Sequence, residues 1–180
     1  MNAVFTIGHS TRTSQEFISL LHEFGVTLLI DVRRFPMSRR YPHFNKAELT
    51  AVLAAAGIDY RHEEVLGGRR APAKNSANDA WRNAQFRGYA DHMDTSAYRV
   101  AVDRIVETAP QTVQAVMCAE AVPWRCHRNL LADALVARGV EVRHIVHSGK
   151  SNPHKLNSDA RIMDDHRIVY SQRVDQMRLL

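Results

Sequence analysis

Short runs of β-forming residues alternate with amphipathic helical segments along most of this chain. The clearest run, Thr27–Val32 (TLLIDV), is almost continuously apolar, as is typical of a strand buried on both faces of a parallel sheet. In the segment before it, the apolar residues recur with the i, i+3, i+4, i+7 spacing of one helix face: Phe17, Leu20, Leu21 and Phe24. This alternation predicts an α/β fold, with a mostly parallel sheet of about five strands and helices on both faces.

The same patterns predict the order of the elements along the chain. Strands are predicted at Ala3–Ile7, Thr27–Val32, Ile58–His62, Thr112–Met117 and Glu141–Val146. Helices are predicted over residues 13–24, Asn45–Ala56, Trp81–Met93, Ser96–Thr108 and Cys126–Arg138, with one more after Asp164. Residues 63–78 contain adjacent glycines, a proline and small polar residues, so we expect a long loop there, and such loops are often functional.

The length of the chain suits a single domain. A chain of 180 residues buries an ample hydrophobic core. We expect one α/β domain over residues 1–147, with residues 148–180 as a C-terminal extension packed on the same domain. No apolar run is long enough to span a bilayer, and the first residues lack a signal-peptide pattern. We therefore expect a cytoplasmic protein with no membrane partner; no sequence feature specifies an oligomeric state.

Charge and cysteine content narrow the expected partners and cofactors. Lysine and arginine outnumber the acids by 24 to 19, which favours anionic partners: a small anionic substrate or nucleic acid. The two cysteines, Cys118 and Cys126, are expected to be thiols rather than a disulfide. Together with Glu120 and His127 they are permissible metal ligands, but their spacing matches no standard zinc pattern. We therefore expect no metal and no other cofactor, although ten histidines keep a metal site open as an alternative.

Ionisable residues follow the predicted strands. The carboxyl ends of parallel strands meet at one edge of a sheet, and ligands of open α/β sheets bind there. The segments concerned are Gly8-His9-Ser10, Asp31-Val32-Arg33, His62-Glu63-Glu64, Cys118-Ala119-Glu120 and His147. The sequence therefore predicts a polar, anion-binding site at this edge.

Asp31 and Arg33 stand two residues apart at the end of the most apolar strand. Strand alternation places them on the same face, either as a local ion pair or as functional groups. The segment 33–43 that follows carries four arginines and two aromatic residues but no acid. This composition suits phosphate contact and base stacking, while the alternative is a solvated loop.

Cys126-His127-Arg128 lies at a predicted helix start. A cysteine in the first turn of a helix has a lowered pKa, and the same position binds anions. Cys126 is thus either a nucleophile or a small residue that lines a phosphate pocket, and Arg128 is a candidate anion clamp. Glu120 is a general base or a residue that orients His127, and the alternative is a capping or salt-bridging carboxylate.

Several motifs, in this order, resemble those of the Domain of Unknown Function 488 family. In the first half of the chain these are residues 6–10 (TIGHS), 29–33 (LIDVR), 36–39 (PMSR), 43–45 (HFN), 57–60 (GIDY) and 66–68 (LGG). In the second half they are residues 86–93 (FRGYADHM), 118–120 (CAE), 126–128 (CHR) and 142–145 (VRHI). The resemblance covers about residues 4 to 147 and implies a compact α/β domain, without specifying an activity.

Carried over position by position, the resemblance implies a set of signature polar residues: His9, Ser10, Asp31, Arg33, Ser38, Glu120, Cys126, His127 and Arg128. We assign Asp31, Glu120, Cys126 and His127 as candidate catalytic residues. The candidate anion-binding residues are His9, Ser10, Arg33, Ser38, Arg39 and Arg128. Two functions follow as hypotheses: an enzyme for a phosphorylated or nucleotide-like substrate, or a nucleic-acid binding module that uses the 33–43 loop.

Overall fold

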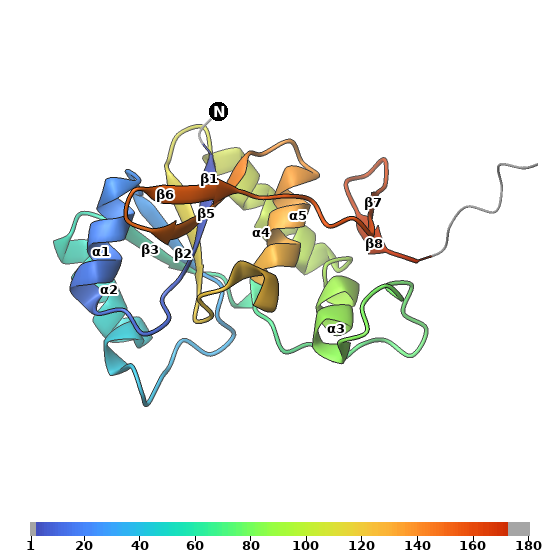
Figure 1. Cartoon of the computed structure of the whole chain (residues 1–180), viewed down its shortest axis with the longest axis horizontal. Coiled ribbons are helices and arrows are strands. Elements are labelled where there is room, and N and C mark those ends of the chain that lie inside the picture. Colours follow the sequence, from blue (N-terminus) through green and yellow to red (C-terminus); the bar gives the residue numbers. More distant parts are fainter. Residues whose placement is uncertain (1–2, 173–180) are drawn as a thin grey trace, which may run out of the picture.

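A six-stranded sheet forms the centre of the molecule, with helices on both of its faces (Figure 1). The computed structural model describes residues 3–172. The strand order is β3-β2-β4-β1-β5-β6, and all neighbours are parallel except the antiparallel pair β5–β6. A second, two-stranded sheet is formed by β7 and β8. The predicted α/β class with a mostly parallel sheet is confirmed, with one strand more than the predicted five.

The bounds of the elements are as follows. The strands are β1 (Val4–Gly8), β2 (Leu28–Asp31), β3 (Asp59–His62), β4 (Gln114–Cys118), β5 (Val142–His147), β6 (Lys150–Pro153), β7 (Ala160–Ile162) and β8 (Ile168–Tyr170). The helices are α1 (Ser14–Glu23), α2 (Lys46–Ala55), α3 (Ala84–His92), α4 (Ser96–Thr108) and α5 (Arg128–Val136). Three 3-10 turns complete the order: Pro42–Phe44, Glu64–Leu66 and Pro123–Arg125.

Right-handed crossovers explain why the helices divide between the two faces. From β1 to β2 and on to β3 the chain moves toward one edge of the sheet, and α1 and α2 cover one face. After β3 it moves back to β4 and then to β5, so α4 and α5 cover the other face. The reversal leaves β1, β2 and β4 at the centre of the sheet, so their carboxyl ends lie side by side.

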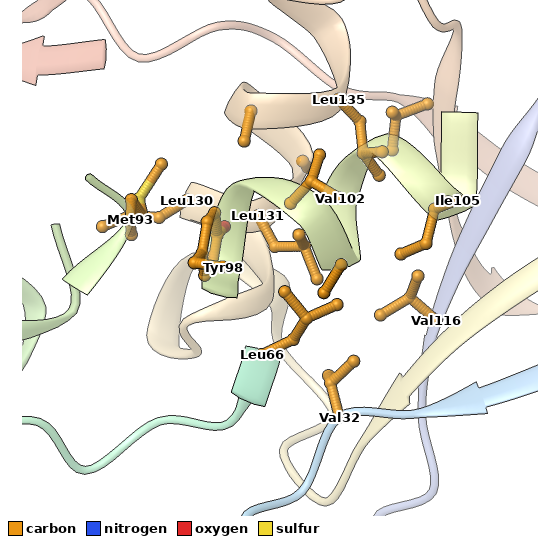
Figure 2. Close-up of a cluster of buried hydrophobic side chains, with 14 of the residues drawn as sticks. Val32, Leu66, Met93, Tyr98, Val102, Ile105, Val116, Leu130, Leu131 and Leu135 are labelled. Atoms are coloured by element: carbon orange, nitrogen blue, oxygen red, sulfur yellow. The ribbon is translucent and has the colours of Figure 1, made fainter. Parts of the chain in front are cut away.

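Each face has its own apolar core because strand residues alternate between the faces. Leu29 and Met117 pack with residues of α1 and α2, whereas Ile30 and Val116 pack with residues of α4 and α5. Figure 2 shows the second core, in which Val116 of β4 lies near side chains of α4 and α5. The continuous apolar character of β2 is therefore explained by burial on both faces.

The helix predicted over Cys126–Arg138 differs in extent, and the helix predicted after Asp164 is wrong in type. The helix predicted over Cys126–Arg138 begins at Arg128, because Pro123–Arg125 forms a separate turn and Cys126 is extended, with φ −131° and ψ 148°. A strand, β8, stands in place of the helix predicted after Asp164; residues 173–180 of that prediction lie outside the described residues. The strand is favoured because Ile168 and Tyr170, two residues apart, bury their side chains on the same side.

The predicted helix over Trp81–Met93 is shorter than expected and starts at Ala84. Asn83 caps it, since its side chain accepts hydrogen bonds from the backbone N–H groups of Gln85 and Phe86.

After residue 147 the chain adds β6 to the edge of the main sheet and then forms the β7–β8 hairpin beside α3. Within residues 3–172, no helix combines the length and apolar character needed to cross a membrane.

Candidate functional site

A cleft of about 1030 Å³ opens at the carboxyl edge of the sheet, above β1, β2 and β4. The loops after these three strands form most of its lining, together with residues 68–69 and the start of α3. Seven of the predicted site residues line it: His9, Ser10, Arg33, Ser38, Glu120, Cys126 and His127. Asp31 and Arg128 lie behind the lining, and Arg39 is exposed outside it.

Arg33 is held from behind by Asp31. The Asp31 carboxylate is fully buried and accepts hydrogen bonds from Nε of Arg33 at 2.9 Å and from Nη2 at 2.6 Å. Tyr60 donates to the same carboxylate at 2.8 Å, and Nη2 of Arg33 also donates to the Phe44 carbonyl at 2.8 Å. Such a bidentate, buried pair fixes the guanidinium plane. Asp31 therefore acts on the cleft through Arg33.

His9 contributes a neutral imidazole beside this guanidinium. Its ring stacks on Phe44 with centroids 4.2 Å apart, and its Nδ1 lies 3.0 Å from the Ser10 carbonyl. With Nδ1–H donating there, Nε2 accepts from Arg33 Nη1 at 3.5 Å. Burial, followed by the charge of Arg33, lowers the pKa of His9 to about 4. His9 thus offers a neutral ring to the cleft at physiological pH.

The loops after β1 and β4 are paired backbone to backbone. His9 N–H donates to the Cys118 carbonyl at 2.9 Å, and Ser10 N–H donates to the Ala119 carbonyl at 3.0 Å. Gly8 permits this approach, because a Cβ there would lie 2.0 Å from the carbonyl oxygen of Glu120. Ser10 takes the left-handed φ of 50°, which costs free energy in a residue other than glycine. The pairing brings Ser10 and Glu120 to one cleft.

Cys126 and His127 meet Cys118 at the floor of the cleft. The Sγ of Cys126 lies 3.6 Å from Nδ1 of His127, and His127 Nε2 lies 3.2 Å from the Val32 carbonyl. The thiol of Cys118 donates to Cys126 and, with the charge of Arg128, lowers the pKa of Cys126 to about 6 against the effect of burial. The same hydrogen bond, with burial, raises the pKa of Cys118 well above its ordinary value. Burial also lowers the pKa of His127.

Arg128 supports this floor from the protein interior. It is 1% exposed, and its Nη2 donates to the Glu120 carbonyl while Nη1 donates to Thr6 Oγ1 at 3.1 Å. As a result it holds the β4 loop and presents its charge to Cys126. Its position is that of a buried structural cation rather than of a group on the cleft wall.

A chain of buried hydrogen bonds extends from Thr6 to the far side of the core. Thr6 Oγ1 lies 2.7 Å from His144 Nδ1, His144 Nε2 lies 2.9 Å from His154 Nδ1, and His154 Nε2 lies 2.7 Å from Asp133 Oδ1. Asp133 accepts only, so His154 donates to it; with both imidazoles neutral, His144 then donates to His154 and Thr6 donates to His144. Thr6 is then the acceptor for Arg128. Each donor and acceptor in the chain is thereby assigned, ending at the buried carboxylate in α5.

Glu120 lines the cleft with an exposed carboxylate that accepts from Val122 N–H at 3.2 Å. His127 Nε2 pairs with the Val32 carbonyl and not with this carboxylate.

Ser38 organises the 33–43 loop, since its N–H donates to Asn45 Oδ1 at 2.6 Å. Its Oγ accepts from Tyr41 N–H at 3.0 Å. Asn45 therefore steadies this loop rather than capping α2.

Arginines dominate the walls of the cleft. The arginines in its lining are Arg33, Arg34, Arg40, Arg69 and Arg125, against the single acid Glu120 in the described part of the chain. Arg34 lies over the ring of Phe35, and Arg40 lies over that of Tyr41. Phe35 and Trp124, also in the lining, are 59% and 70% exposed. The cleft thus combines positive charge with exposed aromatic planes.

Two of the five predicted strand ends do not reach the cleft. Glu63, after β3, forms ion pairs with Arg61 at 3.2 Å and with Arg104 at 2.9 Å. His147, at the end of β5, is exposed and outside the lining. The reason is the strand order, because β3 and β5 flank the three central strands whose ends form the cleft.

Several lining residues were absent from the predicted site. Arg34, Arg40, Arg69 and Arg125 lie in basic segments of the sequence, but no local signal separates them from the exposed Arg39. Cys118 had a signal, namely its place at the carboxyl end of a buried strand. Among residues 3–172, one group of three metal-ligating side chains has its ligand atoms within 4.8 Å of one another: Cys118, Cys126 and His127.

Comparisons with known proteins identify the family. A family model described as "Domain of unknown function DUF488" matches residues 13–135, more than half of the chain. No curated protein and no solved structure matches the chain. The matched region contains α1, β2, the 33–43 loop and the Cys118–Arg128 segment, and so most of the cleft. The chain therefore belongs to the family of the domain of unknown function DUF488.

Proposed function

We propose that this protein is an enzyme that binds a phosphorylated or nucleotide-like substrate in the cleft. The proposal rests on one observation: anion-binding arginines and side chains of chemically reactive types line the same cleft. Five arginines line its walls, while Cys118, Cys126 and His127 line its floor. A protein that only bound anions would need the arginines, but not a thiol 3.6 Å from an imidazole nitrogen beneath them.

The anion-binding role falls to the cleft arginines. Arg33 is the most rigid of them because Asp31 and the Phe44 carbonyl fix its guanidinium. A rigid guanidinium recognises phosphate through paired hydrogen bonds. Phe35 and Trp124 offer exposed rings on which a base can stack. The cleft volume of about 1030 Å³ accommodates a nucleotide.

The chemical role falls to the floor of the cleft. Cys126 and His127 form the reactive centre in this proposal, with His9 as a neutral imidazole on the neighbouring strand end. Glu120 is the carboxylate assigned to proton transfer, because it lines the cleft and is exposed, whereas Asp31 is occupied by Arg33 and Tyr60. Arg128 stabilises negative charge on Cys126 from behind.

Ligand binding tests the first half of this proposal. Inorganic phosphate and the common nucleoside mono-, di- and triphosphates are titrated by calorimetry into the wild type, Arg40→Gln and Arg39→Gln. Arg40 lines the cleft and Arg39 does not, so the pair is matched in charge and in loop. Arg40→Gln is expected to weaken binding by about 10-fold or more, since one hydrogen bond to a charged group contributes about 1.5–3 kcal/mol. Equal losses in both variants, or no binding by the wild type, would contradict the proposal.

Turnover tests the second half. Each nucleotide that binds is incubated with the wild type and with Cys126→Ser, and its conversion is followed by phosphorus NMR and mass spectrometry. We expect conversion by the wild type and its loss in Cys126→Ser, with binding retained. If the wild type and the variant both bind a ligand and neither converts it, the protein is a binding protein and the proposed enzymatic function is rejected.

A second candidate function is single-stranded nucleic-acid binding. It is favoured by the exposure of Phe35, Met37 and Trp124, 59%, 80% and 70%, beside the cleft arginines. Bases stack on the rings of Phe35 and Trp124 without sequence preference, and arginines contact the phosphates. The test compares oligonucleotides with mononucleotides: an affinity that rises with oligonucleotide length and falls steeply with salt supports this function. Equal affinities for both would rule it out.

A further inference from the structure

We propose that Cys118, Cys126 and His127 form a Cys₂His site for Zn²⁺ at the floor of the cleft. The inference extends the proposed function. It rests on that function in one respect, namely that both place their chemistry in this cleft. It reverses the expectation from sequence spacing, in which the cysteines, separated by seven residues, match no zinc pattern. The structure supplies what the spacing lacks, because the turn Pro123–Arg125 folds Cys126 back onto the end of β4.

The distances among the three donors suit a tetrahedral ion. Both Sγ atoms and an imidazole nitrogen of His127 lie within 4.8 Å of one another. Zn–S and Zn–N bonds of about 2.3 and 2.0–2.1 Å at tetrahedral angles require about 3.6 Å between sulfur and nitrogen. The separation of Cys126 Sγ and His127 Nδ1 is 3.6 Å. Little side-chain movement is therefore needed to close the site.

The orientation of His127 is set by a backbone carbonyl. Its Nε2 lies 3.2 Å from the Val32 carbonyl, so Nε2–H donates and Nδ1 keeps the lone pair that faces Cys126. Metal-ligating histidines nearly always donate their second ring N–H to a carbonyl or carboxylate, which fixes the ring. The ring of Tyr89 packs at 5.0 Å against the imidazole. His127 is thus preorganised as a ligand through Nδ1.

The surroundings suit two thiolates and a cation. Both cysteines are buried, at 8% and 5% exposure, and the Arg128 guanidinium supplies positive charge behind them. Gly68 adjoins His127. A Cβ at position 68 would lie 2.8 Å from Nδ1 of His127, so a side chain there would crowd the proposed ligand atom. Soft thiolates with one imidazole select Zn²⁺ over Mg²⁺ or Ca²⁺.

Three protein ligands leave the fourth position of a tetrahedral ion for water or substrate, as in catalytic zinc sites. All three proposed ligands line the cleft, so a substrate held by the cleft arginines can reach this position. Zn²⁺ there would activate a water or polarise a substrate oxygen. Cys126 would then act as a ligand rather than as the attacking group.

The test measures metal binding by the full chain, reduced and purified without a metal-affinity step. Zinc content is determined by elemental mass spectrometry, and Zn²⁺ and Co²⁺ are then titrated into the chelated protein. We expect about one zinc per chain, a rise of the melting temperature with Zn²⁺, and the thiolate-to-cobalt charge-transfer band with the intense visible bands of tetrahedral Co²⁺. Absence of the charge-transfer band in the wild type overturns the proposed site, irrespective of the metal affinities of the variants.

Variants locate the ligands. Cys118→Ser, Cys126→Ser and His127→Gln should each weaken Zn²⁺ affinity by at least about 100-fold, because loss of a partner that only orients a ligand already costs about 10–100-fold. His9→Gln, which removes another imidazole from the same cleft, should retain the wild-type affinity. Circular dichroism identifies any variant that fails to fold, and the cobalt spectrum of the wild type remains the deciding measurement. Equal weakening in His9→Gln, or wild-type affinity in His127→Gln, contradicts the proposed ligand set.

The outcomes separate this inference from the proposed function. Zinc binding without binding or conversion of any nucleotide supports the metal site and rejects the proposed function. Turnover by chelated protein, with no cobalt–thiolate band, rejects the metal site and keeps the enzyme. A Cys118–Cys126 disulfide that forms under mild oxidation, with no metal bound after reduction, also rejects the metal site.

Discussion

Asp31 and Arg33 form a buried ion pair at the end of β2, with Asp31 Oδ2 2.6 Å from Arg33 Nη2. Both side chains are almost fully buried, at 0% and 6% exposure, yet the arginine belongs to the cleft lining. The carboxylate is therefore a support for the guanidinium. Strand alternation placed the two residues on the same face, and the structure adds Tyr60 and the Phe44 carbonyl as further partners.

Asp31→Asn is expected to cost about 3–5 kcal/mol of the free energy of unfolding, because it leaves the charge of Arg33 buried without its partner. It should also weaken phosphate binding. Urea unfolding and calorimetry measure the two effects. Glu141→Gln breaks the exposed pair with Arg143, leaves the hydrogen bonds of Arg143 to Ser151 intact, and serves as the control, expected to cost about 1 kcal/mol or less. A loss in Asp31→Asn no larger than in this control would refute the supporting role.

Gly8→Ala is expected to destabilise the protein by about 2 kcal/mol or more, since the new Cβ would lie 2.0 Å from the backbone oxygen of Glu120. The displaced β4 loop should also reduce ligand binding in the cleft. Ser10→Gly, two residues on, is the matched control. Its φ of 50° favours glycine, so unfolding should show a change between zero and about 1 kcal/mol of stabilisation. The reverse order of stabilities would contradict this account of the β1–β4 junction.

Asp133→Asn is expected to cost about 3 kcal/mol. Asp133 accepts from His154, from Tyr170 Oη at 2.8 Å and from Asn157 N–H at 3.1 Å, and an amide cannot accept on both sides. Tyr170→Phe removes one of these donors and should cost about 1 kcal/mol. Chemical denaturation measures both. Equal costs would indicate that Asp133 is held by Tyr170 alone and does not anchor the histidine chain.

Stability should fall as the pH drops from about 6.5 toward 4. Burial lowers the pKa of His9 and of His144 to about 4. For His9 the charges of Arg33 and His43 add to this lowering, while the hydrogen bond to the Ser10 backbone and the charge of Asp31 oppose it. For His144 the charges of His154 and Arg128 add to burial. Between these values the unfolded chain takes up protons that the folded protein does not, so unfolding is favoured; well above pH 6.5 both imidazoles are neutral in either state, and this contribution no longer changes with pH.

Each of the two histidines should contribute about 2 kcal/mol of lost stability at pH 5 relative to pH 7.5. His92 and His127, whose pKa values are also lowered by burial, act in the same direction. Urea unfolding at the two pH values measures the difference, and His9→Gln should reduce it. An unchanged pH dependence in that variant would show that His9 is not protonated on unfolding in this range.

The order of strands and helices could be predicted because it depends on local periodicity. The apolar run of β2 and the helical stripe of α1 each specify an element within a short window, and both are confirmed. Strand β6 was missed because its sequence, KSNP at residues 150–153, is polar and forms an exposed edge. The helix predicted after Asp164 was wrong because two buried residues, Ile168 and Tyr170, decide that segment through tertiary contacts.

Much of the candidate site also followed from the sequence by itself, namely the carboxyl-edge position and the pairing of Asp31 with Arg33. Both depend on the direction and alternation of single strands, which residue patterns determine locally. Only the tertiary structure decided that Cys118 meets Cys126 and His127, that Arg128 is buried behind them, and that Arg40 but not Arg39 lines the cleft. These relationships depend on strand order and on the fold of the turn at Pro123–Arg125. They are set by the packing of distant segments, which no local pattern encodes.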